Sequence, residues 1–256
     1  MKFPKGIWSM AIVFLCLIVA SESYAADIWL FDEVNGDKVA EVSGTGIEGE
    51  ISGNYKYVAG KFGEALEFNG ENTSVLFEND DPKQAFILHR GKDVSLVFWA
   101  KPSSGNFRTI FWTRGDGADA DRFNIHSGPG PTLGFDYREV NGNIHQGLYE
   151  NVPLPINEWT HIAISREGNT YNTYSNGILV SQGEDQNPAL PQSISWMLSR
   201  PGFIFGGIID EIGFFESVLN ENDVASIMEN GLESTTLAVA PSGKISTTWA
   251  RLKRGR

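Results

Sequence analysis

The sequence predicts an all-β fold, in which two antiparallel sheets form a sandwich and one short helix lies near the C-terminus. Three observations support this fold class. Short β-type runs alternate with turn residues about every ten positions from Asp27 onward. Glycine accounts for 28 of the 256 residues, against about 7% in an average protein. Only the segment 219–231 has the apolar spacing of an amphipathic helix.

The predicted strands follow one another along the chain at 28–31, 65–68, 74–77, 94–100, 108–113, 122–126, 132–137, 144–149, 159–165, 170–175, 178–181 and 203–215. We expect the last of these to break at Gly206-Gly207. Asn176-Gly177 predicts a hairpin with a type I′ turn, because both central residues of that turn need φ > 0. Both alternating sets of side chains in 159–164 are partly apolar, so this strand is expected to be buried on both faces.

The helix has a start and a stop signal. Asn220 can accept hydrogen bonds as the N-cap, and Asp223 stands at the third helical position. Leu219 can pack against Val224 as a hydrophobic staple. Gly231 is then expected to end the helix.

Residues 1–25 predict a secretory signal peptide. Two lysines precede an apolar run at 10–20, and Ser23-Tyr24-Ala25 places small residues before the cleavage point. The run is shorter than the ~20 residues of a membrane-spanning helix, and a retained anchor is the alternative. The single cysteine, Cys16, lies in this segment. We therefore expect a mature, disulfide-free chain that is secreted or displayed at the cell surface, with the periplasm as the other possible location.

The charge balance excludes one class of protein. The chain has 20 Lys and Arg against 32 Asp and Glu, a net charge of −12, whereas a non-specific nucleic-acid binder needs a basic surface. After Glu233 all the charged residues are basic. Residues 233–256 are therefore expected to form a poorly ordered basic tail behind a single domain at 26–232. Contact with a membrane surface is expected only through this tail.

Six segments in this order resemble one family: 29–33, 63–70, 94–102, 159–163, 174–177, and Ile209-Asp210-Glu211-Ile212 followed by the helix. The sequence resembles the laminin G-like branch of the concanavalin A-like lectin/glucanase superfamily over about residues 28–232. The resemblance implies a jelly-roll of two packed antiparallel sheets. It also implies a secreted or surface-displayed domain that often binds glycans and often carries a calcium ion.

No catalytic pattern is present in the sequence. Relatives that cleave polysaccharides place acids as Glu-x-Asp-x-Glu on one strand, which puts the carboxylates on one face, and no strand here has that pattern. The chain also lacks Gly-x-Ser-x-Gly, His-Glu-x-x-His and Walker-type motifs. His161 is expected to be a structural, hydrogen-bonded histidine. The sequence thus predicts a non-catalytic protein, and the alternative is a polysaccharide hydrolase or lyase with an unrecognised active site.

A structural Ca²⁺ ion is the cofactor that the sequence predicts. The resemblance implies a side-chain ligand at Asp210, and the turn at Asn69 can add an oxygen ligand of the kind that calcium takes. The alternative is a carboxylate that accepts hydrogen bonds from backbone amides. A second acidic group, Asp116, Asp119 and Asp121, is expected to be a solvated hairpin tip.

Aromatic rings and hydrogen-bonding side chains on a loop rim predict a glycan site. The candidates are Trp112, Tyr137, Arg138, Tyr149 and Trp196, the last within the polar stretch 193–200. The alternative is that these side chains pack within a sheet layer. Trp29, Trp99 and Trp159 are expected in the core.

The sequence therefore favours a secreted carbohydrate-binding or adhesion module. Its partner is expected to be a glycan, an extracellular polysaccharide or a surface protein. A structural surface domain that binds another protein is the remaining alternative.

Overall fold

A computed structural model of the protein describes residues 26–32, 34–78, 93–114, 122–138, 144–146, 152–184 and 195–235. Of residues 26, 34, 35, 114, 122, 136–138 and 144–146 it describes only the backbone. The predicted signal peptide, the Asp116–Asp121 loop, Tyr149 and the chain after residue 235 lie outside these ranges.

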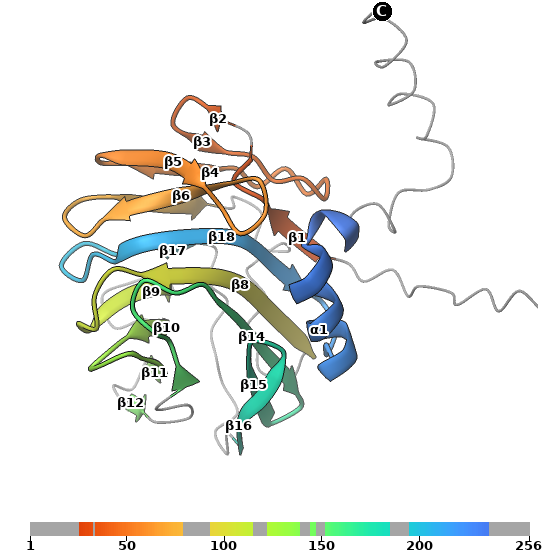
Figure 1. Ribbon diagram of the computed structural model, residues 1–256. Helices are drawn as coiled ribbons and strands as arrows, with labels where there is room; N and C mark the ends of the chain where they lie inside the picture. The colour runs from red at the N-terminus through yellow and green to blue at the C-terminus, as the bar shows by residue number, and fades with distance from the viewer. Residues whose placement is uncertain are drawn as a thin grey trace, which may run out of the picture.

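Two antiparallel sheets pack face to face within the described ranges (Figure 1). One has eight strands in the order β16-β15-β14-β8-β18-β6-β5, with β1 also paired to β18. Its strands are β1 (Ala26–Trp29), β5 (Tyr55–Ala59), β6 (Glu64–Asn69), β8 (Val94–Pro102), β14 (Thr160–Glu167), β15 (Thr170–Ser175), β16 (Ile178–Glu184) and β18 (Gly206–Phe215).

The other sheet has ten strands in the order β12-β11-β10-β9-β17-β7-β4-β3-β2, with β13 paired to β11. Its strands are β2 (Val34–Asn35), β3 (Lys38–Val39), β4 (Gly49–Ser52), β7 (Ser74–Glu78), β9 (Arg108–Arg114), β10 (Arg122–Ser127), β11 (Thr132–Arg138), β12 (Ile144–Gln146), β13 (Val152–Pro153) and β17 (Ser195–Leu198). The predicted two-sheet sandwich is thus confirmed.

The main core fills the space between the sheets and is rich in aromatic rings. Trp29, Phe77, Trp196 and Phe214 meet there, and the rings of Phe77 and Trp196 stack with centroids 3.6 Å apart. The buried rings remove large apolar areas from water, which is the main favourable contribution to folding. This core joins both sheets into one body.

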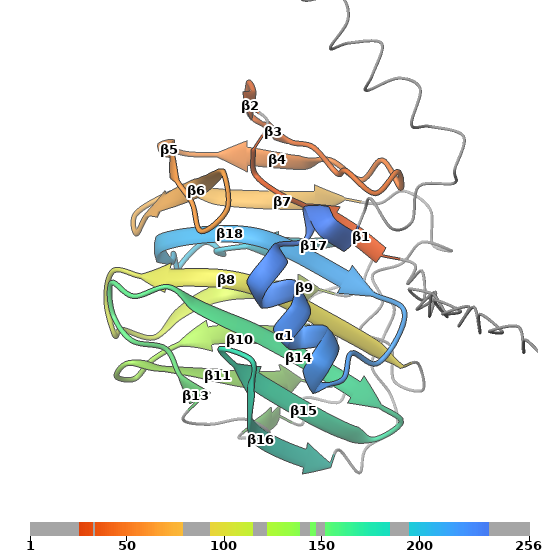
Figure 2. The same cartoon turned by 45° about the vertical axis from the view of Figure 1, so that its right-hand side comes forward.

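A second, smaller core lies on the outer face of the eight-stranded sheet. There helix α1 (Glu221–Asn230) crosses the sheet (Figure 2). Its buried residues Val224 and Ile227 pack against a cluster that includes Val97 of β8 and Ala163 of β14. As predicted, Asn220 caps the helix.

The predicted hairpin is also confirmed, because Asn176 and Gly177 both have positive φ between β15 and β16. Strand β14 is buried on both faces along almost its whole length. The segment 203–205 is a loop, and β18 begins only at Gly206. The sequence did not predict β2, β3, β4, β5, β13 or β17. Trp29 lies in the core, whereas Trp99 is buried on the outer face beneath Lys61 and Trp159 is partly exposed.

Among the described residues, no helix has the length and apolar character needed to span a membrane.

Candidate functional site

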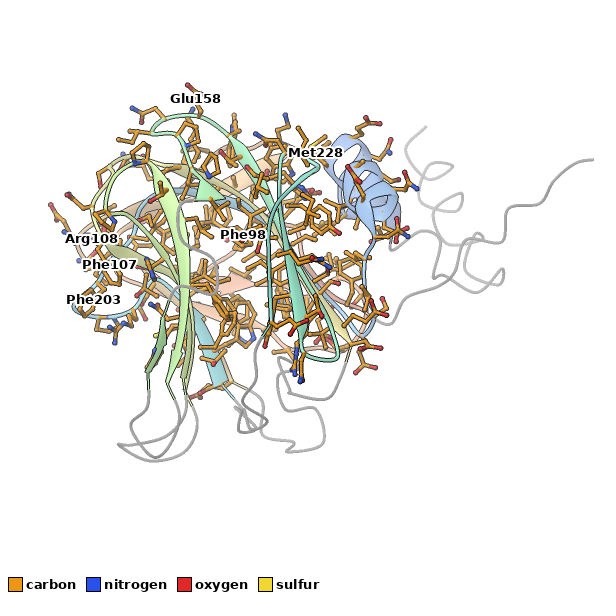
Figure 3. All side chains as sticks on the ribbon, turned by 90° about the horizontal axis from the view of Figure 1, so that it is seen from below. Phe98, Phe107, Arg108, Glu158, Phe203 and Met228 are labelled. Atoms are coloured by element: carbon orange, nitrogen blue, oxygen red, sulfur yellow. The ribbon has the colours of Figure 1, made fainter. Side chains whose placement is uncertain are left out.

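The ten-stranded sheet presents a group of aromatic side chains and one arginine near the loops that precede β9 and follow β17. This aromatic patch consists of Phe107, Trp112, His126, Arg200 and Phe203. Phe107 and Phe203 are each 37% exposed, and their ring centroids lie 5.7 Å apart. Figure 3 shows both labelled residues together at one side of the molecule, away from Met228 on α1. Large apolar groups left exposed side by side often mark a binding surface.

Polar side chains pack on the two exposed rings. The imidazole of His126 lies 4.3 Å from the Phe107 ring, at an interplanar angle of 33°. The guanidinium of Arg200 lies 4.2 Å from the Phe203 centroid and 5.6 Å from that of Trp112. Such contacts between a cation and an aromatic face are attractive. The aromatic patch therefore offers apolar ring surface with nitrogen-bearing groups beside it.

A tight turn holds Arg200 and Phe203 together. Phe203 donates its backbone N–H to the Arg200 carbonyl at 3.0 Å, with Pro201 and Gly202 between them. Gly202 has φ +84°, so the turn has Pro at its first central position and a positive-φ glycine at its second, as a type II turn requires. Thr109 then donates its N–H to the Phe203 carbonyl at 2.9 Å. The turn is thereby fastened to the start of β9.

Buried polar side chains orient Arg200. Its Nε donates to the Thr109 hydroxyl at 3.2 Å, and that hydroxyl donates to Asn124 Oδ1 at 3.1 Å. Thr109 and Asn124 are both buried. Because its orienting partner is buried in the sheet, the guanidinium is pre-organised, and a ligand would not have to order it.

The predicted glycan residues have different positions. Trp112 belongs to the aromatic patch. Trp196 does not, and this prediction was wrong. It is only 3% exposed and stacks on Phe77 in the core, so the stated alternative of packing within a sheet layer applies to it.

Tyr137 and Arg138 lie on β11, where Tyr137 pairs with Phe123 and Arg138 with Arg122 of β10. Only their backbone is described. Tyr149 lies outside the described residues. The structure thus brings Trp112 together with Phe107, His126, Arg200 and Phe203, which sequence reasoning missed. The Pro201-Gly202 turn signal could have indicated Arg200 and Phe203, and no sequence signal indicates the other two.

The predicted calcium ligands Asp210 and Asn69 are not neighbours. Asn69 on β6 pairs with Gly206, four positions before Asp210 on β18, which is about 13 Å at about 3.4 Å per residue. Asn69 Oδ1 accepts backbone N–H groups of Glu71, Asn72 and Thr73. The prediction that both residues bind the same calcium ion was therefore wrong, because the register of the sheet separates them.

Asp210 instead anchors the loop before β6. Its Oδ2 accepts the backbone N–H groups of Lys61 at 2.7 Å and Phe62 at 3.1 Å. Burial raises the pKa of Asp210 to about 7, although these hydrogen bonds oppose the shift. This matches the alternative of a carboxylate that accepts amide hydrogen bonds. In the part of the chain that the structure describes, no group of three or more His, Cys, Asp or Glu side chains is arranged to hold a metal ion.

Glu211 has a matching role at the end of the helix. Its φ is +44° at a point where the pairing of β18 with β8 shifts register. Its carboxylate accepts the backbone N–H of Leu232 at 3.0 Å. Burial raises the pKa of Glu211 to about 8, and the Asp210 carboxylate adds to the shift. Strongly shifted pKa values can indicate an active site, but here both carboxylates bind backbone amides and are closed to solvent.

His161 is buried beside these groups. It is in register with Trp99, whose ring lies 5.0 Å away, and Trp99 is in register with Asp210. Burial lowers the pKa of His161 to about 4, with the Lys61 charge as a second cause. The imidazole is therefore neutral at physiological pH. Its burial is typical of a structural residue.

The two packed antiparallel sheets, with helix α1 on the outer face, are typical of a concanavalin A-like jelly-roll. The family model described as "Concanavalin A-like lectin/glucanases superfamily" (Laminin_G_3) matches residues 69–225, which is more than half of the chain. The protein therefore belongs to this superfamily. Comparison with curated proteins finds no similar sequence.

Solved structures share the fold. Domain 4 of AbnA, a GH43 extracellular arabinanase from Geobacillus stearothermophilus solved with arabinotriose, is 20% identical with a TM-score of 0.64, covering 81% of this chain and 100% of that domain. The binding domain of Paraclostridial Mosquitocidal Protein 1 is 16% identical with a TM-score of 0.61, covering 80% of this chain and 52% of that one. The botulinum neurotoxin serotype D binding domain is 14% identical with a TM-score of 0.62, covering 80% and 51%. The present chain thus spans about half of each toxin binding domain.

Proposed function

We propose that this protein is an exported, non-catalytic glycan-binding module and that the aromatic patch is its binding surface. The observation that carries the proposal is the pair of half-exposed rings, Phe107 and Phe203, beside the oriented guanidinium of Arg200. Sugars present C–H faces that pack on aromatic rings and hydroxyls that accept hydrogen bonds from arginine. The patch offers both.

The comparisons support the same class of function. The superfamily includes lectins and glucanases by its description, and the AbnA domain was solved with an arabinose oligosaccharide. The toxin domains are binding domains of larger proteins. A binding role agrees with the placement of the shifted carboxylates Asp210 and Glu211, which hold backbone amides in the sheet and beside the helix.

A glycan array tests the proposal directly. We expect the protein to bind at least one glycan, and the Phe107→Ala and Phe203→Ala double variant to lose about tenfold or more in affinity, because each aromatic contact contributes about 0.5–1.5 kcal/mol beyond its buried area. Ile178→Ala is the control, since Ile178 on β16 is 65% exposed and lies outside the patch.

The alternatives predict different outcomes. Reducing-sugar release from a polysaccharide panel would identify the hydrolase, and an unsaturated product the lyase. A protein that binds no glycan on the array, with or without calcium, would instead be a protein-binding surface domain.

A further inference from the structure

The two exposed rings of the aromatic patch are nearly perpendicular. The planes of Phe107 and Phe203 meet at 77°. His126 packs on the first ring and Arg200 on the second, and each phenylalanine is 37% exposed. The exposed surface is therefore a corner of two rings with an imidazole and a guanidinium at its flanks (Figure 3 labels both phenylalanines).

The backbone fixes the positions of the two phenylalanines, and their polar neighbours restrict the planes of the rings. Phe203 is hydrogen-bonded through its N–H to Arg200 and through its carbonyl to Thr109. Phe107 directly precedes β9, which starts at Arg108 and pairs with both β10 and β17. Turning either ring about its side-chain bonds would break its contact with His126 or with Arg200. A ligand must therefore fit the corner as it stands.

A perpendicular pair of rings selects among polysaccharides by shape. A sugar stacks on an aromatic ring with its C–H face roughly parallel to the ring plane. A flat ribbon such as cellulose or chitin presents successive faces in parallel planes, so it can stack on only one ring of the corner. A chain that twists strongly, or branches, presents neighbouring faces at a steep angle and can use both rings.

We propose that the aromatic patch binds a twisted or branched soluble polysaccharide and discriminates against flat crystalline ones. This inference rests on the proposed glycan-binding function and adds to it the shape class of the ligand. The interplanar angle of Phe107 and Phe203 carries it.

The test compares two kinds of probe. Microcrystalline cellulose and chitin are used in co-sedimentation, and linear arabinan, xylan and amylose in affinity electrophoresis. We expect binding to at least one soluble chain and retention on the crystalline polymers that is at least about tenfold weaker. Phe107→Ala and Phe203→Ala, tested singly, should each weaken the soluble interaction about two- to tenfold, while Ile178→Ala leaves it unchanged.

Each outcome bears on a separate claim. Retention on cellulose or chitin that the patch variants abolish would overturn the shape selection and leave the glycan-binding function standing. Loss of binding in only one of the two single variants would overturn the use of both rings. Failure to bind any of these polymers or any glycan of the array would overturn the proposed function itself. Phe203→Leu keeps apolar volume without the ring, so it replaces Phe203→Ala if melting shows that the latter does not fold.

Discussion

At the scale of single residues, Asp210 joins the eight-stranded sheet to a distant loop. It is fully buried, and its Oδ2 accepts two backbone amides of the 61–62 segment. Its Oδ1 is buried and has no hydrogen-bond partner in the structure. Buried polar atoms are usually satisfied by protein, water or an ion. The unsatisfied oxygen is thus the observation that keeps a calcium ion at Asp210 a prediction to be tested.

Two variants measured with and without a chelator separate the ion from the anchor. If Asp210 serves only to accept backbone amide hydrogen bonds, Asp210→Ala is expected to lower the free energy of unfolding by about 1–3 kcal/mol, because buried N–H donors lose their acceptor. Asp210→Asn is expected to lower it less, because its amide oxygen can accept the same hydrogen bonds. An anchor without an ion gives the same result in calcium and in chelator. A wild-type melting temperature that falls on chelation, with no such fall in Asp210→Asn, would establish the ion instead.

Two tryptophans show what sequence alone leaves open. Trp112 is in register with Met197, and Trp196 with Thr113, on the neighbouring strands β9 and β17. The one-residue offset puts their side chains on opposite faces of the sheet. One therefore reaches the surface and the other the core. Because the two strands are far apart in the sequence, their register is set by the folded sheet and cannot be predicted from the sequence of either strand.

At the scale of elements, the sequence predicted the features that depend on contacts between residues close together in the chain. The cap of α1 and the Asn176-Gly177 hairpin depend on residues close together in the chain. β17 has four residues and β4 also four, which is too short to show a periodic pattern. Most of the aromatic patch was missed for a different reason, because its members come from β9, β10 and two loops that only the folded sheet brings together.

One prediction at this scale concerns the turn from Arg200 to Phe203. Gly202→Ala is expected to cost about 1–2 kcal/mol of stability, because Gly202 has φ +84° and no neighbouring atom that a Cβ would meet. Strain in the turn should also displace Phe203 and weaken glycan binding. Gly168→Ala is a matched control, since Gly168 has φ +57°, equally open surroundings and a position in the β14–β15 turn. Denaturant unfolding should show a similar cost in both variants, and unchanged glycan binding in Gly202→Ala would contradict a role for this turn.

At the scale of the whole molecule, the acidic chain buries several carboxyl groups away from the sandwich core. Burial raises the pKa of Asp27 to about 6, of Asp210 to about 7 and of Glu211 to about 8. Asp27 lies on β1, and Asp210 and Glu211 lie on β18, which pairs with β1. These groups couple the stability of one region to pH, because burial favours their neutral forms.

The expected pH profile follows from the sign of these shifts. A carboxyl whose pKa is higher in the folded state than in the unfolded chain keeps its proton on folding between the two values, so the contribution of these three groups to stability is greatest below about pH 4 and is lost as pH rises towards about 8. His161, whose pKa is lowered to about 4, acts in the opposite direction between about pH 4 and 6.5, so the net fall is expected above about pH 6.5. Each group can contribute a slope of up to about 1.4 kcal/mol per pH unit within its own window, less where water reaches it.

Free energies of unfolding measured from pH 4 to 9 in the presence of chelator check this pH dependence. Glu211→Gln, which keeps an acceptor for the Leu232 amide, should flatten the profile mainly between pH 5 and 8, and Asp27→Asn mainly between pH 4 and 6. A wild-type protein whose stability rises from about pH 6.5 to 8 would show that Asp210 and Glu211 are ionised in the folded state.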